Sequence, residues 1–240
     1  MRTGKESSPE KPEDLVCVLR ELFRARRWKE TGMLDELIGR YPVLEPCRQS
    51  IRQAYQAMEE CFLGGGKLLV AGNGGSAADS DHIVGELMKG FVKKRPLPDF
   101  LVQALKEADP QRGAELSQKL QGALPAIALT NHAALSSAFA NDVDGILSYA
   151  QQVNGYGNKG DVFLGISTSG NAENVMYAAV TARAKGMKVI GLTGRDGGKL
   201  GAFADVSIIV PERETYRIQE LHLPVYHALC LMLEERFYDR

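Results

Sequence analysis

Two junctions rich in glycine, serine and asparagine contain the residues best suited to chemistry. The first is AGNGGSAADSDHIVGE at residues 71–86, and the second is GISTSGNAENV at residues 165–175. Each follows a short hydrophobic run and precedes a segment that can form a helix. Backbone N–H groups and hydroxyls gathered at such a junction can hold a phosphate without a metal. We therefore expect the chain to bind a phosphorylated small molecule.

The second junction offers three consecutive hydroxyls, from Ser167, Thr168 and Ser169, just before a helix expected to start near Asn171. An ordinary helix cap needs only one such residue. Three in a row, with Gly170 beside them, favour an anion site, because hydrogen bonds to a charged phosphate belong to the strong class.

The first junction places Asn73, Gly74, Gly75 and Ser76 in a row. It matches neither the dinucleotide fingerprint GxGxxG nor the P-loop, and neither junction contains the P-loop lysine. This argues against a nucleotide cofactor and leaves a sugar phosphate, whose hydroxyls Asn73 and Ser76 could bond. A tight connection between strand and helix is the alternative interpretation.

His82 and Glu86 follow the first junction and are four residues apart. At that spacing the two side chains project from one face of a helix. A neutral imidazole beside a carboxylate suits zinc ligation and proton transfer alike. A solvated pair with no function is the common alternative for this spacing.

Near the carboxyl end, RIQELHLPVYHALC places Gln219, His222 and His227 on a largely apolar helix. A polar side chain on an apolar face needs a partner, and a hydrogen-bonded core histidine is the usual explanation. Glutamine is a poor zinc ligand, so this spacing alone does not predict a metal site.

Composition excludes several classes of function. The 240 residues are 44% hydrophobic, and 29 Lys plus Arg against 30 Asp plus Glu give a net charge of −1. This balance predicts no general attraction to nucleic acid or to anionic membranes. The chain shows no apolar run of the roughly 20 residues that span a bilayer and no signal peptide, so a cytoplasmic protein is expected. Its four cysteines are far apart and are interpreted as buried hydrophobic residues.

Five short apolar runs alternate with helix-length segments and predict a parallel β-sheet covered by helices on both faces. The runs are Leu68–Ala71, Ala126–Thr130, Val162–Ser167, Val189–Thr193 and Val206–Val210. Residues 1–12 are expected to be disordered and residues 13–65 to form helices before a core domain at 66–240. Within that domain, residues 93–124 are expected to make a helical excursion, and residues 212–238 a long final helix. Ligands of such sheets bind at the carboxyl ends of the strands, where both junctions lie.

Four motifs in register, GNGGSAADSDH, GISTSGN, LTGRDGG and RIQELH, resemble the sugar isomerase (SIS) domain of the phosphoheptose isomerase family over about residues 67–238. The resemblance implies a five-stranded α/β sandwich and a homotetramer with sites between subunits. It also implies conversion of sedoheptulose 7-phosphate to D-glycero-D-manno-heptose 7-phosphate, the first step toward ADP-heptose and the lipopolysaccharide core.

The resemblance also assigns roles to residues. It implies a phosphate loop at Ser167, Thr168 and Ser169, a sugar-contacting turn from Asn73 to Ser76, and contacts to sugar hydroxyls from Asn141 and Asp142. Family members that bind zinc use four residues that correspond to His82, Glu86, Gln219 and His227, so one zinc ion per subunit is expected.

Two features depart from the family pattern. Ala172 replaces a serine of the phosphate loop, and the excursion at 93–124 is longer than usual. For an aldose–ketose isomerisation we assign Glu86 as the base and His227 as its acid–base partner, with Gln219 also available to the substrate. A carboxylate bound to zinc is a weaker base, so either the coordination shifts during turnover or the zinc is structural.

Two other functions compete with the enzyme. One is a non-catalytic SIS tetramer that binds a partner protein, as the relative associated with the replication initiator DnaA does. The other is a sugar-phosphate sensor, although no basic helix-turn-helix accompanies the domain. The joint presence of Glu86 and His227 favours an enzyme, because a scaffold has no physical need for both.

Overall fold

The structure, a computed structural model, describes residues 31–238. The tail predicted at 1–12, Cys17 and the first part of the predicted helical segment lie outside these residues. The remainder of that segment forms a helix, a 3₁₀ turn and a second helix, which are α2 (Thr31–Arg40), η1 (Pro42–Cys47) and α3 (Arg48–Leu63).

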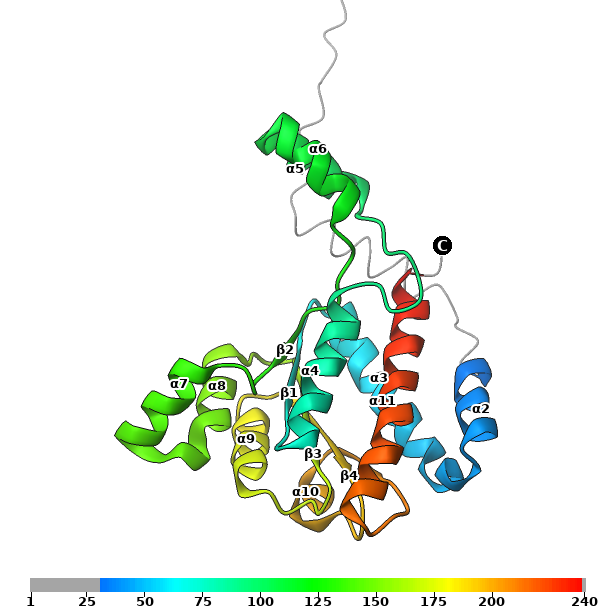
Figure 1. Cartoon of the computed structure of the whole chain (residues 1–240), viewed down its shortest axis with the longest axis vertical. Helices are drawn as coiled ribbons and strands as arrows, with labels where there is room; N and C mark the ends of the chain where they lie inside the picture. Colours follow the sequence, from blue (N-terminus) through cyan, green and yellow to red (C-terminus); the bar gives the residue numbers. More distant parts are fainter. Residues whose placement is uncertain (1–30, 239–240) are drawn as a thin grey trace, which may run out of the picture.

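A five-stranded, fully parallel sheet in the order β2-β1-β3-β4-β5 forms the centre of the molecule (Figure 1). Its strands are β1 (Leu68–Ala71), β2 (Ala126–Ala128), β3 (Val162–Ser167), β4 (Lys188–Thr193) and β5 (Val206–Ile209). All five predicted runs contain a strand, and the predicted α/β class is confirmed. The run at Ala126–Thr130 ends two residues earlier as a strand than its apolar pattern suggested.

Helices cover both faces of the sheet, because alternate strand residues point to opposite sides. Leu68 and Val70 join one core with α2, α3, α4 and α11, whereas Leu69 and Ala71 join a second core with α8, α9 and α10. These helices and the connecting turns are α4 (Gly75–Met88), α7 (Ala133–Phe139), η2 (Ala140–Asp144), η3 (Gly145–Leu147), α8 (Ser148–Tyr156), α9 (Glu173–Ala184), α10 (Gly198–Phe203) and α11 (Thr215–Tyr238).

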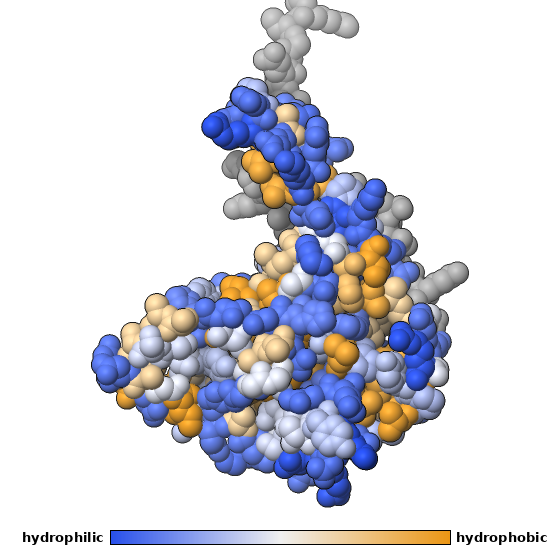
Figure 2. All heavy atoms as spheres, in the orientation of Figure 1, coloured by the Kyte–Doolittle hydropathy of each residue, from blue (hydrophilic) through white to orange (hydrophobic). Residues whose placement is uncertain are grey.

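Two short helices, α5 (Asp99–Ala108) and α6 (Pro110–Lys119), lie within the segment predicted as a helical excursion. They pack against each other as a hairpin that stands off the body (Figure 1). Its visible surface is mostly hydrophilic with some hydrophobic side chains (Figure 2). Phe100, Leu116 and Leu120 are exposed in this segment. Among residues 31–238 no helix is long and apolar enough to cross a membrane.

Candidate active site

The two glycine-rich junctions lie side by side, because they follow the paired strands β1 and β3 at the same edge of the sheet. Two amide side chains hold them together: Asn73 donates to Asn174 at 2.9 Å, and Asn174 donates back at 2.8 Å. The turn before α4 needs glycine at Gly74, whose φ is +56°. The Tyr149 hydroxyl anchors the same turn by donating to the Gly72 carbonyl at 2.7 Å. The predicted phosphate loop and sugar-contacting turn therefore form one surface.

The loop of the second junction that contains Ser167, Thr168 and Ser169 precedes the amino terminus of α9. Ser167 is buried, and Thr168 and Ser169 are half-buried. The loop is internally braced, because the backbone N–H of Asn171 donates to Ser169 Oγ at 3.2 Å. Ala172 occupies the N-cap and makes no side-chain cap bond. The N–H of Val175 donates to Asn174 Oδ1 at 3.0 Å, so the N–H groups of Glu173 and Asn174 are those that this end of the helix offers to an anion.

Helices α4 and α11 pack side by side and bring three titratable side chains together (Figure 1). His82 Nε2 lies 3.3 Å from Glu86 Oε1 on the same helix. The rings of His82 and His227 meet edge to face, with centroids 5.0 Å apart. The side chain of His82 is 41% exposed and that of Glu86 13%. The cluster is therefore accessible from one side while its carboxylate is largely shielded from water.

The environment of His227 keeps its imidazole neutral. Burial, and then the neighbouring His82, lower the pKa of His227, while Glu86 acts in the opposite direction. Its Nε2 is buried without a hydrogen-bond partner. A neutral imidazole with an unpaired nitrogen can accept a proton or bind a metal.

A buried ion pair fixes the distance between the two helices. The carboxylate of Glu234 on α11 accepts the backbone N–H groups of Phe91, Val92 and Lys93 at 2.8, 2.9 and 3.1 Å. It also accepts Arg95 Nε at 2.8 Å, and both side chains of this pair are fully buried. The same guanidinium donates to the carbonyls of Leu87 at 2.7 Å and Glu86 at 2.8 Å, at the end of α4.

This ion pair also positions one wall of the cluster. The segment that it holds presents the Phe91 ring to His227, with ring centroids 5.4 Å apart. Burial raises the pKa of Glu234, but the backbone N–H bonds and Arg95 outweigh burial and hold that pKa below its usual value. The carboxylate therefore stays ionised within the core.

Three other predicted residues lie apart from the trio of His82, Glu86 and His227. The Gln219 amide packs on the first turn of α4, with Nε2 2.5 Å from where a Cβ on Gly75 would be. His82 is seven residues further along that helix, about 10 Å at 1.5 Å per residue. Asn141 and Asp142 bond to each other at 2.8 Å on the exposed turn η2.

His222 belongs to the core. It is fully buried and its Nε2 bonds to the Thr193 carbonyl oxygen at 3.2 Å. Burial lowers the pKa of His222 to about 4. Of the interpretations that the sequence left open for His222, the hydrogen-bonded core histidine is the one that fits.

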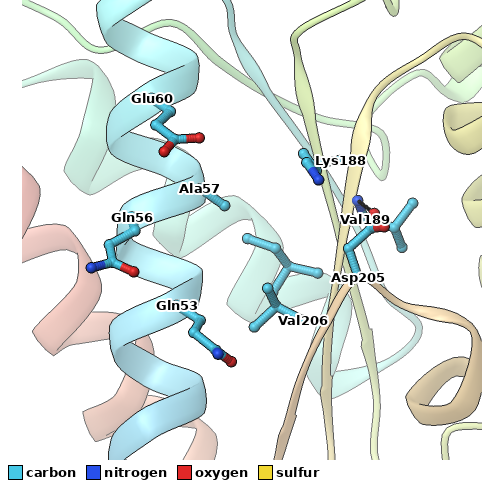
Figure 3. Close-up of a pocket in the computed structure, with 9 residues that line it drawn as sticks. Gln53, Gln56, Ala57, Glu60, Lys188, Val189, Asp205 and Val206 are labelled. Carbon is cyan, nitrogen blue, oxygen red and sulfur yellow. Dashed lines mark hydrogen bonds between the residues drawn. The ribbon is translucent and has the colours of Figure 1, made fainter.

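A surface hollow of about 260 Å³ lies elsewhere, between α3 and the amino-terminal ends of β4 and β5. Gln53, Gln56 and Glu60 on the helix and Lys188 and Asp205 at the strands line it, and Figure 3 shows Gln53 and Glu60 extending toward the strands. Parallel sheets bind ligands at the carboxyl ends of their strands. The hollow is at the opposite edge from the two junctions and is not part of the candidate site.

Comparison with known proteins identifies the family to which this architecture belongs. Residues 112–194 match the SIS domain family. The chain is 39% identical over 211 residues to a phosphoheptose isomerase of Methylibium petroleiphilum, covering 83% of this chain and 92% of the relative. The chain belongs to the phosphoheptose isomerase family.

Solved structures of the phosphoheptose isomerase family have the same fold. The structure from Neisseria gonorrhoeae matches with a TM-score of 0.62 and 32% identity, covering 92% of this chain and 98% of that one. The structure from Francisella tularensis matches with a TM-score of 0.63 and 29% identity, covering 94% and 100% of the two chains.

The donor atoms suit the zinc ion that the resemblance to phosphoheptose isomerases implies. Two ligands of a tetrahedral zinc ion with bonds of about 2.0–2.1 Å are about 3.3 Å apart, the separation of His82 Nε2 and Glu86 Oε1. His227 adds an unpaired Nε2 nearby. Among residues 31–238, however, no three His, Cys, Asp or Glu side chains already surround one point as ligands. The donors fit the ion, but in this chain they are not fully assembled around it.

The sequence did not single out four residues that contact or support this candidate site. They are Asp79, Arg95, Tyr226 and Glu234. Asp79 is three residues before His82, so helical spacing from a predicted site residue was an available signal for it. Tyr226 directly precedes His227, and adjacent residues of a helix do not share a face, so spacing from His227 gave no such signal. No local signal pairs Arg95 with Glu234, which are 139 residues apart in sequence.

Proposed function

We propose that the chain, a sugar-phosphate isomerase by family, interconverts sedoheptulose 7-phosphate and D-glycero-D-manno-heptose 7-phosphate through an enediol or enediolate. One observation carries the proposal. Glu86 and His227, which are 141 residues apart in sequence, converge beside His82 where α4 packs on α11. The helix that holds Glu86 starts at the junction suited to a phosphorylated ligand.

The substrate phosphate is proposed to bind the loop at Ser167, Thr168 and Ser169, where hydroxyls and the amino terminus of α9 offer donors. The two hydrogen bonds between the Asn73 and Asn174 amides join this loop to the start of α4. From Gly75 to His82 the helix rises about 10 Å. An extended seven-carbon sugar phosphate has a comparable length, so its carbonyl end can approach the trio while its phosphate stays on the loop. In this proposal Asn73 to Ser76 and Gln219 contact the sugar between these ends, and Asn141 and Asp142 bond sugar hydroxyls.

The reaction moves two protons and changes no oxidation state overall. Glu86 removes a proton from C1 of the ketose, the C1–H pair forms the C1–C2 double bond, and O2 gains a proton. The enediol then loses the proton on O1, and Glu86 returns its proton to C2 to give the aldose. His227 takes the O1 proton and supplies the O2 proton, a role suited to a neutral imidazole with an unpaired Nε2.

The proposal includes one zinc ion per subunit, with His82, Glu86, Gln219 and His227 as ligands. Zinc bound there would polarise the substrate carbonyl and stabilise negative charge on the enediolate. Because a zinc-bound carboxylate is a weaker base, Glu86 serves both roles only if its coordination changes during turnover. The alternative is that the metal has a structural role and Glu86 reacts as a free carboxylate.

We further propose a cytoplasmic homotetramer whose sites lie between subunits and whose product leads toward ADP-heptose and the lipopolysaccharide core. Exposure of His82 supports a shared site, because a second subunit could cover the open side of the trio. A groove of about 160 Å³ between α2 and α11 adjoins His227 and offers such a contact. No nucleic acid, membrane or nucleotide cofactor enters the proposal.

The test is conversion of sedoheptulose 7-phosphate to the aldose by the purified chain, followed by NMR, with fructose 6-phosphate as a shorter ketose. We expect turnover of the heptulose phosphate, and Glu86→Gln should lower the turnover number by about 100-fold or more with the fold intact. No conversion by the unaltered chain would refute the enzyme and favour the partner-binding scaffold or the sensor. An unchanged rate for Glu86→Gln would remove Glu86 from the mechanism.

A further inference from the structure

Two side chains that the proposed reaction does not use meet His82 inside the interface of α4 and α11. Tyr226 on α11 is 1% exposed, and its hydroxyl lies 3.0 Å from His82 Nδ1. The same hydroxyl donates to Asp79 Oδ1 at 3.2 Å. Asp79 and His82 are three residues apart, so both project from one face of α4 toward Tyr226. The three side chains form a continuous hydrogen-bonded chain that ends at the candidate site.

Stability alone does not explain this arrangement. Asp79 Oδ2 is buried without a hydrogen-bond partner, and burial raises the pKa of Asp79 while Tyr226 and His82 oppose that rise. An unsatisfied buried carboxylate oxygen costs folding free energy that an apolar side chain of similar size would not. The carboxylate therefore has a role beyond packing.

Counting protons fixes the direction of each bond. The Tyr226 phenol has a single proton to donate, and its hydroxyl lies 3.2 Å from Asp79 Oδ1. A carboxylate oxygen accepts, so the Tyr226 proton points to Asp79. The Tyr226 oxygen is then an acceptor for His82, whose Nδ1 must carry a proton. In the tautomer that carries its proton on Nδ1, Nε2 has a lone pair and no proton.

The lone pair on His82 Nε2 faces the carboxylate oxygen of Glu86 at 3.3 Å. Two acceptors at that distance repel each other, and a cation between them removes the repulsion. We propose that Asp79 and Tyr226 are positioning residues that hold His82 in the Nδ1–H tautomer and so present its Nε2 lone pair to a cation shared with Glu86. This inference rests on the proposed function in one respect, the identity of the cation as zinc.

The energetic consequence follows from other histidine–metal sites. There, a carboxylate or carbonyl usually accepts the second ring N–H, and loss of that partner costs about 10–100-fold in metal affinity. In this chain Tyr226 stands between the imidazole and the carboxylate, so removing either Tyr226 or Asp79 should have this effect. Without the hydroxyl, His82 gains a better bond by protonating Nε2 and donating to Glu86. Without Asp79, the hydroxyl turns and donates to His82 Nδ1, with the same result.

The first experiment reads the tautomer directly in the metal-free protein. Nitrogen-15 NMR of the histidine rings, with His82 signals assigned from His82→Gln, distinguishes a protonated from an unprotonated Nδ1. We expect Nδ1–H in the unaltered chain and Nε2–H in Tyr226→Phe and in Asp79→Leu. An Nε2–H tautomer in the unaltered chain, or the Nδ1–H tautomer retained in both variants, would overturn the proposal.

The second experiment measures zinc affinity by competition with a chelator. Tyr226→Phe and Asp79→Leu should each weaken binding about 10–100-fold, while Tyr177→Phe, at an exposed tyrosine on α9, leaves it unchanged. Thermal unfolding of the metal-free variants separates positioning from packing, because a merely structural pair would lower the melting temperature without changing the tautomer. Unchanged zinc affinity in both variants counts against the proposal. Isomerase activity is measured separately: its absence from the unaltered chain would refute the proposed function and leave the tautomer result standing.

Discussion

The buried Arg95–Glu234 pair should be among the most sensitive points in the protein. Arg95→Met removes the guanidinium and leaves Glu234 ionised in the core, with its backbone N–H donors but without a counter-charge. It also removes the Arg95 donor from the Glu86 carbonyl and leaves the Leu87 carbonyl with only the backbone N–H of Leu124, at 3.0 Å. Removing one member of a buried pair costs about 3–5 kcal/mol in the free energy of unfolding. That is a large share of the stability of a typical domain.

Urea denaturation of Arg95→Met measures this cost, and two variants serve as comparisons. Arg112→Met breaks an ion pair with Asp109 whose side chains are 80% and 39% exposed, so its cost should stay within about 1 kcal/mol. Arg95→Lys keeps a positive charge but lacks the planar fork that reaches Glu234 and two carbonyls together, and should recover only part of the loss. If Arg95→Met costs no more than Arg112→Met, our account of how α4 and α11 are held together is wrong.

Three further perturbations follow from the structure. Ser169→Ala should raise the KM for the sugar phosphate more than it lowers kcat, because the phosphate is bound alike in ground and transition states; lowered kcat alone would contradict this. His222→Gln should flatten the acid side of the stability profile. The neutral, buried His222 contributes stability above pH 6.5 that is lost as pH falls toward about 4, at up to about 1.4 kcal/mol per pH unit; equal pH slopes of unfolding free energy would count against it. Gly170→Ala should destabilise by about 1–3 kcal/mol, because φ is +67° and a Cβ would overlap the Gly197 carbonyl. Gly39→Ala, with open space around it, is the control and should be neutral or stabilising.

The sheet was predictable because each strand is a short apolar run that ends at a turn. The run at residues 162–167 is buried at every position, the pattern that a central parallel strand requires. The boundary error in β2 has the same origin: Leu129 is fully buried and apolar but lies beyond the last paired residue. Burial and strand pairing are separate properties, and an apolar run reports only the first.

The candidate site was predictable where one local element sets the geometry. His82 and Glu86 are four apart on one helix, and their contact follows from that spacing. The approach of His227 requires the packing of α11 on α4, which only the family resemblance anticipated. Arg95 and Glu234 sit in strongly charged stretches typical of solvated surface, yet both are fully buried. Their pairing depends on contacts made only after folding.

Gln219 illustrates the limit of carrying roles over from relatives. Eight residues separate it from His227 on α11, about 12 Å along the helix axis. In the structure of this chain its amide lies on Gly75. If Gln219 joins the other proposed ligands, its side chain must turn along the helix or meet a second subunit, and no local sequence pattern encodes either event.

The central claim is that Glu86 moves a carbon-bound proton of a sugar phosphate while His227 serves the oxygens. The most direct measurement incubates the chain with sedoheptulose 7-phosphate in heavy water and follows deuterium at C1 of the ketose by NMR. Our account predicts incorporation by the unaltered chain and a loss of at least about 100-fold in its rate for Glu86→Gln. Isomerised product without deuterium beside the carbonyl, or equal incorporation by the variant, would contradict it.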